Sequence, residues 1–277
     1  MSTSSDVLAE FIQSHQPLVI ITGAGCSAAS GIPTYRDNGG IWKRSTPIQH
    51  QDFVTKLASR KRYWARSLAG WPAVAQAEPN ACHRSIAEIE KMNLCSLLVT
   101  QNVDRLHQRG GHQNVIDLHG RLDQVHCLDC LDEISREDMQ ERLFRLNPEL
   151  EFNSTQLAPD GDADVPDHLI DTIALPDCDH CGGLLKPSVI FYGGSVAKET
   201  VNKIFSAIDS ARGVLVLGSS LMVFSSYRFC RQANRRGVPL TIVNSGTTRA
   251  DELASLKINA LCEQLLPATV QALQANK

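Results

Sequence analysis

The 277-residue chain lacks any strong excess of charge, since 27 Lys and Arg stand against 30 Asp and Glu. A formal net charge of −3 gives no general attraction to nucleic acid or to an anionic membrane, so we expect neither as a partner. Long apolar runs are lacking too, and a run such as 18–21 is far too short to span a bilayer. We therefore expect a globular protein that works in water.

Basic residues are absent from the first 35 positions, and the first of them is Arg36. A secretory signal carries positive charge near its start, and a mitochondrial presequence carries arginines along one helix. Because both features are lacking, we expect a cytoplasmic location. Internal repeats and low-complexity segments are also lacking, which excludes a repeat architecture.

Cysteine, in contrast, is abundant, with nine residues at positions 26, 82, 95, 127, 130, 178, 181, 230 and 262. An odd number without a secretory signal is a poor disulfide framework. Four of them form two Cys-x-x-Cys pairs, Cys127 with Cys130 and Cys178 with Cys181. Four thiolates are enough for a closed, structural Zn²⁺ site, provided that the fold brings the distant pairs together. We predict one structural zinc ion, with two unrelated turns as the alternative.

Continuously apolar segments predict strands that are covered on both faces of a parallel sheet. They lie at 18–22, 97–100, 213–217 and 239–244, with helical stretches such as 202–212 and 227–236 between them. A further helix is expected at the start of the chain, after a cap at Ser5 or Asp6. This alternation predicts an α/β, doubly wound, Rossmann-type domain.

Residues 121–186 interrupt that alternation, because they hold both cysteine pairs. Between the pairs, the passage 159–179 contains seven Asp and no Lys or Arg, which also argues against nucleic acid as a partner. We predict that 121–186 form a small zinc-binding module inserted into a Rossmann-type domain made of 1–120 and 187–277.

A glycine turn directly follows the first predicted strand, where residues 22–28 read Thr-Gly-Ala-Gly-Cys-Ser-Ala. Glycines allow a tight turn and let backbone N–H groups approach a pyrophosphate, so this motif predicts a dinucleotide site. A turn that needs glycine for its own geometry is the alternative. The acidic residue that dehydrogenases carry about twenty positions further on is lacking. NAD therefore fits the motif, but hydride transfer is not supported.

Polar residues also follow two other strands, with Thr-Gln-Asn-Val-Asp at 100–104 and Leu-His-Gly at 118–120. Ligands of open α/β sheets bind at the carboxyl ends of the strands. Asn102, Asp104 and His119 would there be able to hold ribose hydroxyls and move a proton. Ordinary caps and a turn histidine remain open as alternatives.

Together these motifs resemble the signature motifs of the sirtuins. The match continues in the same order through Ser-Gly-Ile-Pro-Thr-Tyr-Arg at 30–36, both cysteine pairs, Lys-Pro at 186–187, Gly-Ser-Ser at 218–220 and Val-Asn at 243–244. It covers nearly the whole chain. Pro-Ile-Gln-His at 47–50 and Tyr-Trp-Ala-Arg at 63–66, with the long gap between the cysteine pairs, look most like the class II branch, which includes a mitochondrial member in animals. Where Cys26 stands, the family usually has Ile.

The resemblance implies a NAD-dependent protein lysine deacylase whose acyl-lysine substrate enters a cleft between the two domains. In that reaction the acyl oxygen attacks C1′ of the nicotinamide ribose, nicotinamide leaves, and the acyl group ends on ADP-ribose. The resemblance makes His119 the general base, and Asn102 and Asp104 the residues that hold the nicotinamide ribose and carboxamide. The other NAD contacts that it implies are Gly23, Ala24, Gly25, Cys26, Ser27, Tyr35, Arg36, Gln101, Val103, Gly218, Ser219, Ser220, Asn244, Ser245, Gly246 and Cys262.

Substrate recognition is the least determined part of this interpretation. Ile190 and Tyr192 would line an apolar tunnel for the acyl-lysine, with a buried strand as the alternative. Tyr63 and Arg66 share a helix face, and such a pair resembles the device by which some sirtuins bind acidic acyl groups. The hypothesis is that Arg66 binds a carboxylate-bearing acyl chain such as succinyl or glutaryl; a solvated helix arginine is the alternative.

Two other functions use the same residues. Protein mono-ADP-ribosyl transfer would pass C1′ to a protein side chain, and a NAD-sensing binding protein would not turn the dinucleotide over. We expect a monomer.

Overall fold

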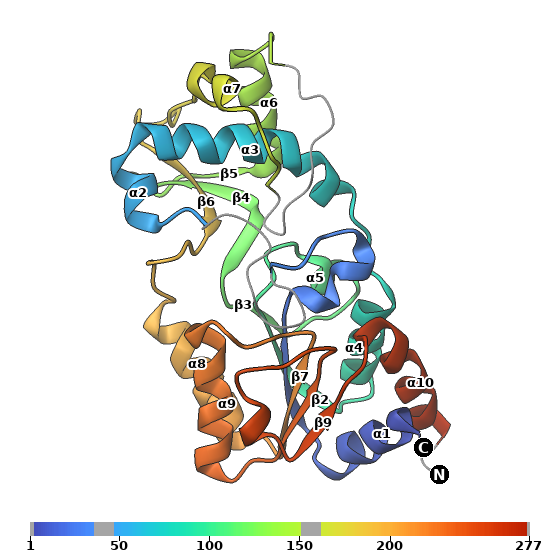
Figure 1. Ribbon diagram of the computed structural model, residues 1–277. Coiled ribbons are helices and arrows are strands. Elements are labelled where there is room, and N and C mark those ends of the chain that lie inside the picture. Colours follow the sequence, from blue (N-terminus) through green and yellow to red (C-terminus); the bar gives the residue numbers. More distant parts are fainter. Residues whose placement is uncertain (1–2, 36–46, 151–161, 276–277) are drawn as a thin grey trace.

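The computed structural model describes residues 3–35, 47–150 and 162–275 (Figure 1). In these ranges, six parallel strands form one sheet in the order β3-β2-β1-β7-β8-β9. The strands are β1 (Leu18–Thr22), β2 (Cys95–Thr100), β3 (Val115–Asp117), β7 (Gly213–Leu217), β8 (Leu240–Val243) and β9 (Leu256–Ile258). The strand order reverses between β1 and β7, and such a switch point is where open α/β sheets bind ligands. The predicted doubly wound sheet is confirmed.

Helices cover both faces of this sheet. On one side lie α1 (Ser4–Ser14), α4 (Ala81–Lys91) and α10 (Cys262–Ala275), and on the other lie α8 (Lys198–Ser210) and α9 (Phe224–Arg236) (Figure 1). Within β1, Leu18 and Ile20 pack into the first core, whereas Val19 and Ile21 pack into the second. Every residue of β1 is therefore buried, which explains its continuously apolar sequence.

Helix α1 begins slightly earlier than the sequence indicates. Thr3 is the N-cap, because its side chain accepts a hydrogen bond from the N–H of Asp6 while the Asp6 carboxylate accepts one from the N–H of Thr3. The expectation of a cap at Ser5 or Asp6 is wrong. Asp6 supplies the returning half of a capping box and so lies inside the first turn.

A second, three-stranded sheet has the order β5 (Glu133–Ser135), β4 (Gly120–Cys127), β6 (Leu185–Val189), and its strands are antiparallel. Helices α6 (Arg136–Leu146) and α7 (Asp167–Thr172) belong to the same stretch of chain. The three-stranded sheet pairs Cys127 with Leu185, so it joins the two halves of the chain that carry the cysteine pairs.

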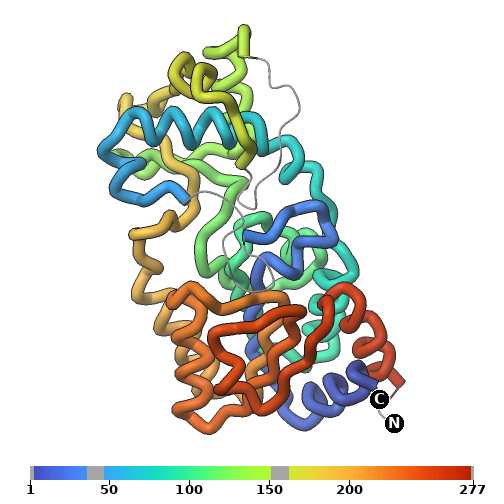
Figure 2. The backbone as a smooth tube through the Cα atoms, in the orientation of Figure 1, coloured from blue at the N-terminus to red at the C-terminus, as the bar shows by residue number. Residues whose placement is uncertain are grey.

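Two helices from the N-terminal part of the chain complete this second unit. They are α2 (His50–Thr55) and α3 (Leu57–Gln76), and Figure 2 shows them beside the green and yellow segments of the small sheet. Phe53 and Trp64 share one core with Val125 and Met139. The packed unit therefore extends beyond 121–186, because the apolar side of α3 is covered by that sheet. The exact domain boundaries remain predictions.

The remaining elements are short: η1 (Ala24–Cys26), η2 (Ala28–Ser30), α5 (Leu106–Arg109) and η3 (Asp251–Leu253). No described helix combines the length and the apolar character that a membrane crossing requires.

Candidate active site

The glycine turn lies against the end of β7. The N–H of Gly23 donates to the carbonyl of Leu217 at 3.1 Å, and the N–H of Gly25 donates to that of Gly218 at 2.8 Å. A Cβ on Gly25 would lie 2.8 Å from Cα of Gly218, and one on Gly218, whose φ is +58°, would lie 2.7 Å from N of Cys26. Glycine is therefore required at both positions by the close approach of the two segments at the switch point.

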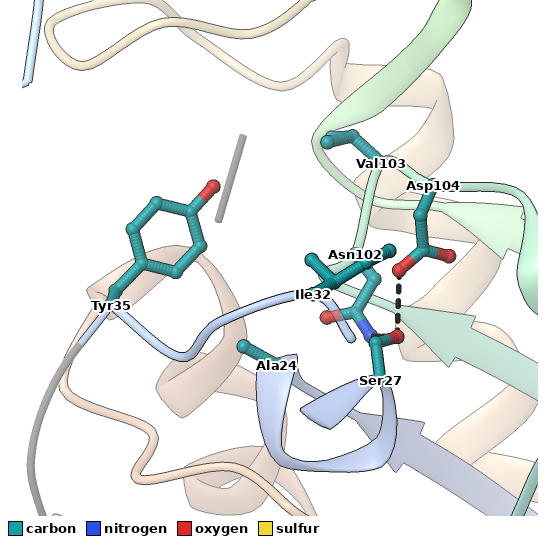
Figure 3. A pocket seen from close by; sticks show the side chains of 7 residues that line it. All are labelled: Ala24, Ser27, Ile32, Tyr35, Asn102, Val103 and Asp104. Carbon is teal, nitrogen blue, oxygen red and sulfur yellow. Dashed lines mark hydrogen bonds between the residues drawn. The ribbon is translucent and has the colours of Figure 1, made fainter. Parts of the chain in front are cut away.

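A pocket opens beside this turn (Figure 3). Seven residues from separate segments line it, and all but Ile32 are predicted NAD contacts: Ala24, Ser27, Ile32, Tyr35, Asn102, Val103 and Asp104. Tyr35 lies on the opposite side of the pocket from the Asn102, Ser27 and Asp104 side chains (Figure 3). Ile32 is the one residue of this lining that the sequence did not single out. Arg36, also predicted to contact NAD, lies outside the described residues.

A chain of hydrogen bonds holds the polar wall of the pocket in place. Asn102 Nδ2 donates to the carbonyl of Gly23 at 3.1 Å and to Ser27 Oγ at 2.9 Å. Ser27 Oγ in turn donates to Asp104 Oδ2 at 2.6 Å (Figure 3). Burial raises the pKa of Asp104, although the Ser27 hydroxyl and the N–H of Leu106 act in the opposite direction. The two predicted catalytic residues of this segment thus share one hydroxyl.

His119 lies two residues after the end of β3, at the same edge of the sheet. Its Nδ1 is 3.1 Å from the carbonyl of Gln101, which can only accept, so we assign the proton to Nδ1. Nε2 then carries the lone pair and accepts from Ser225 Oγ at 2.7 Å. Burial lowers the pKa of His119, while the hydrogen bond to Gln101 opposes this shift. The imidazole is therefore neutral near pH 7, as a general base must be.

Gln101 connects three strand ends. Its Nε2 donates to the carbonyl of Thr22 at 3.0 Å and to Ser219 Oγ at 2.7 Å, and its Oε1 accepts from Ser226 Oγ at 2.9 Å. Since Thr22 ends β1 and Ser219 follows β7, the amide spans the switch point. This brings together two of the predicted NAD contacts, Gln101 and Ser219.

The remaining residues predicted to contact NAD fall into two groups. Ser220 follows β7, and Asn244, Ser245 and Gly246 follow β8 at the same sheet edge, where Asn244 Nδ2 donates to the carbonyl of Gly246 at 3.0 Å. Cys26 and Cys262, in contrast, are 0% and 3% exposed, and their side chains belong to the core beneath the turn. Contacts of these two cysteines with NAD would involve the backbone.

The two cysteine pairs meet as predicted. Cys127 Sγ lies 3.5 Å from Cys181 Sγ, Cys130 Sγ lies 3.7 Å from Cys178 Sγ, and all four sulfur atoms are within 4.8 Å of one another. A tetrahedral zinc ion with bonds of about 2.3 Å requires sulfur atoms about 3.8 Å apart. The four thiolates therefore fit one structural zinc ion.

The turn after Cys178 is shaped for this metal. Gly182 has a φ of +74° and its N–H donates to the carbonyl of Cys178 at 2.8 Å, while a Cβ on Gly183 would lie 2.8 Å from Cys127 Sγ. Four sulfur ligands complete the shell, so we assign the metal no catalytic step.

The predicted substrate residues come from α3 and from the segment that follows β6. Tyr63 is buried on α3, and its ring lies 5.1 Å from that of Phe191. The N–H of Ile190 donates to the carbonyl of His119 at 2.8 Å, and the carbonyl of Tyr192 accepts from the N–H of His50 at 2.7 Å. β6 ends at Val189, so neither Ile190 nor Tyr192 belongs to a strand of the small sheet.

Arg66 is not a solvated helix arginine. Its side chain is 17% exposed, its Nε lies 3.0 Å from Asp162 Oδ2, and its Nη2 lies 3.6 Å from Asp164 Oδ1. Arg66 Nε also donates to the carbonyl of Ala163 at 3.1 Å. An acidic acyl group would meet an arginine that already holds carboxylates.

Several residues of the site are not among those that the sequence motifs indicate. Ser225 and Ser226, at the start of α9, contact His119 and Gln101. His83 Nε2 lies 3.4 Å from Ser27 Oγ, and its Nδ1 accepts from the N–H of Asn80, the N-cap of α4. Burial lowers the pKa of His83 to about 4. The pair Pro-Asn at 79–80 before a helical stretch is the one signal that indicated a cap there.

Comparison with known proteins agrees with this geometry. The model of the Sir2 family matches residues 23–225, which include the glycine turn, His119 and both cysteine pairs. The chain belongs to the Sir2 family. A NAD-dependent protein deacetylase of Xanthomonas campestris pv. campestris is 48% identical over 266 residues, covering 96% of this chain and 91% of the relative. The NAD-dependent protein deacylase Sirt4 of Drosophila melanogaster is 44% identical over 263 residues, covering 94% and 84%.

Solved Sir2 structures are similar over the whole fold. A structure of Sir2 with a p53 peptide and NAD⁺ has a TM-score of 0.78 at 27% identity, covering 98% of both chains. A structure of Sir2 bound to an acetylated peptide also has a TM-score of 0.78 at 27% identity, covering 97% of this chain and 98% of the other. The α/β fold with its small second sheet is therefore the fold of the Sir2 family.

Proposed function

We propose that this Sir2-family chain is a NAD-dependent protein lysine deacylase, which transfers an acyl group from lysine to ADP-ribose and releases nicotinamide. One observation carries the proposal: the half-buried His119 is neutral, with its proton on Nδ1 and its Nε2 lone pair facing only the exchangeable hydroxyl of Ser225 among the printed contacts of that atom. It lies at the same sheet edge as the pocket of Asn102 and Asp104. The deacetylase name of the Xanthomonas relative and the peptide and NAD⁺ of the Sir2 structure support it.

Bound NAD supplies the C1′–nitrogen bond that breaks and the ADP-ribose that accepts the acyl group. We assign the phosphates to the turn 23–27, and the adenosine end to 218–220 and 244–246 with Cys262. Tyr35, which lines the pocket, and Arg36 are proposed as further contacts of NAD. Asn102 and Asp104, held to each other through Ser27, orient the nicotinamide ribose and carboxamide, and Gln101 and Val103 adjoin them. These positions fix the ribose before any bond breaks.

His119 Nε2 accepts a proton from a ribose hydroxyl. The proton on Nδ1 stays there and is donated to the carbonyl of Gln101. This hydrogen bond fixes the orientation of the ring and keeps the lone pair on Nε2. Ser225 occupies that lone pair in this structure, so its hydroxyl must turn away when the ribose hydroxyl arrives. The N–H of Ile190 donates to the carbonyl of His119. This hydrogen bond keeps Ile190, which we propose to line the acyl-lysine tunnel, beside the base.

The test is product analysis by mass spectrometry. The purified chain is incubated with NAD and acetyl-, succinyl- or glutaryl-lysine peptides, and free nicotinamide, O-acyl-ADP-ribose and modified protein are quantified. We expect nicotinamide and O-acyl-ADP-ribose in equal amounts with at least one peptide. ADP-ribosylated protein in place of the acyl product would establish mono-ADP-ribosyl transfer, and NAD binding without nicotinamide release would establish a sensor.

We further propose a reducing compartment, the cytoplasm, and a monomeric state. None of the nine cysteines is in a disulfide, which is the usual condition of cysteines in a reducing environment. Cell fractionation tests the location, and light scattering of the eluting protein tests the oligomeric state.

A further inference from the structure

A second cysteine cluster lies beneath the glycine turn. It consists of Cys26, Cys82 and Cys262, whose sulfur atoms are all within 4.8 Å of one another. The three residues come from η1, α4 and α10, and their exposed fractions are 0%, 0% and 3%. Helices α4 and α10 lie side by side on this face of the sheet (Figure 1). Three segments far apart in the sequence thus direct one thiol each to the same point.

Ordinary packing accounts for this cluster less well than for the other buried thiols. Cys95 and Cys230 each lie in the core outside either cysteine cluster, as a small apolar side chain does. Cys82 and Cys262 are in the first turns of α4 and α10, helices of 11 and 14 residues. The start of a helix favours a thiolate, and the hydrogen bond from the Cys26 thiol lowers the pKa of Cys262. The pKa of Cys82 is raised by the same neighbour and by burial, so Cys82 loses its proton only when a metal binds.

The donor set of the cluster is small and soft. Among the described residues, no His, Asp or Glu belongs to it, so it offers three sulfur atoms and no harder ligand. A closed zinc site takes four ligands, as the other cysteine cluster provides. Thiolates select Cu⁺, zinc and iron–sulfur clusters. Because structural zinc and iron–sulfur clusters take four protein ligands, Cu⁺ is the one of these that suits three sulfur atoms. A trigonal ion with bonds of about 2.3 Å needs sulfur atoms about 4.0 Å apart.

We propose that Cys26, Cys82 and Cys262 form a binding site for a single Cu⁺ ion, separate from the zinc site. The required spacing lies inside the 4.8 Å limit within which the three sulfur atoms fall, so small side-chain movements are enough. The ion would sit behind the turn that lines the pocket, held there through Cys26. Asn80 Nδ2 donates to the carbonyl of Cys26 at 2.8 Å, which ties the turn to the start of α4.

The test is a titration with Cu⁺ under anaerobic conditions. The full chain with its zinc in place is offered Cu⁺ as the coloured bathocuproine disulfonate complex, and copper and zinc bound to the protein are measured after desalting. We expect one copper per chain with the zinc retained. Cys82→Ala, which removes one ligand outside the proposed NAD contacts, should weaken copper binding more than about a hundredfold, beyond the effect of losing a residue that only supports a ligand.

Cys230→Ala is the matched control, because Cys230 is equally buried and lies outside the cluster. It should bind copper like the wild type, and Cys82→Ser, which keeps the side-chain size, should fail like Cys82→Ala. The proposal is overturned if Cys82→Ala binds copper normally, or if copper uptake releases an equal amount of zinc. A second zinc in the trio, or a mass that matches a disulfide there, overturns it equally. None of these measurements depends on NAD or on deacylation.

Discussion

The guanidinium Nε of Arg66 lies 3.0 Å from a carboxylate oxygen of Asp162, and their side chains are only 17% and 11% exposed. An acidic acyl group that is to bind Arg66 must therefore compete with Asp162, whereas an acetyl group need not. If Arg66 binds an acidic acyl chain, the interaction of that chain with the guanidinium must be stronger than the interaction of Asp162 with it.

We expect Asp162→Asn to raise kcat/KM for a glutaryl-lysine peptide by about fivefold, on the order of 1 kcal/mol, because the competing charge is removed. Hydrolysis of the acetyl peptide should not change. Asp164→Asn is the control, since Asp164 is 62% exposed and 3.6 Å from the guanidinium. Arg66→Met should reduce glutaryl-lysine turnover selectively, and an equal loss on both peptides would sink the acyl-reading hypothesis.

His119→Ala should lower kcat by roughly 10²–10⁴-fold, the usual contribution of a general base, with zinc content and fold retained. In the wild type the neutral imidazole is the active form, and burial lowers its pKa. Activity should therefore persist on acidification below the ordinary histidine pKa of about 6.5. A pH profile of kcat/KM measures this, and an acid limb above that value would contradict the assignment.

Ser225→Ala tests the other contact of the same ring. Because Ser225 Oγ donates to Nε2 at 2.7 Å, its removal frees the lone pair and strips a hydrogen bond from the neutral form. The acid limb of the profile should then move toward higher pH, while zinc content stays the same. An unchanged profile would show that this contact has no influence on the base.

Cys178→Ser should abolish zinc binding and lower the melting temperature by roughly 10 °C or more, because a structural metal contributes folding free energy directly. A strong chelator should do the same to the wild type. Cys230→Ser is a suitable comparison, since it introduces the same polar atom into a fully buried site away from the metal. It should lose some stability but keep its zinc, whereas zinc loss there would undermine the comparison.

Stability should fall as the pH is lowered from about 6.5 to 4, in part because of His83. The folded protein keeps His83 neutral down to its pKa of about 4, whereas the unfolded chain takes up the proton near 6.5. The unfolded state then binds more protons, so the free energy of unfolding decreases on acidification. His83 alone accounts for roughly 3 kcal/mol over this range. Chemical denaturation at several pH values measures it.

His83→Gln should flatten that pH dependence by about one proton. His168→Gln, at an exposed position on α7, should leave the slope as it is. Burial lowers the pKa of His107 and His112 as well, so part of the slope will remain in the His83 variant. A slope unaltered in His83→Gln would contradict the assignment.

The sequence predicted the central sheet well, because a strand buried on both faces must be apolar throughout, as β1 is. It also placed the two Cys-x-x-Cys pairs in one cluster, since their ligand chemistry does not depend on the intervening chain. It did not assign α3 to the zinc-binding unit, because the apolar side of a helix does not indicate which sheet will cover it.

Contacts between segments that are far apart in the sequence could not be predicted for the same reason. Ser225 lies 106 positions from His119, and nothing local marks it as the partner of Nε2. Nothing in the sequence around Cys82 links it to another cysteine, and only the packing of α4 against η1 and α10 places it beside two other sulfur atoms.

Strand β4 connects the cysteine cluster to the candidate active site. β4 begins at Gly120, next to His119, and ends at the proposed zinc ligand Cys127. A strand of eight residues, at most about 26 Å long, therefore connects His119 to the cysteine cluster. The antiparallel partner of β4, β6, follows the second cysteine pair and leads to Ile190. The N–H of Ile190 donates to the carbonyl of His119. A zinc ion on the four cysteines would thus hold together the far ends of two paired strands, whose near ends lie next to His119 and Ile190.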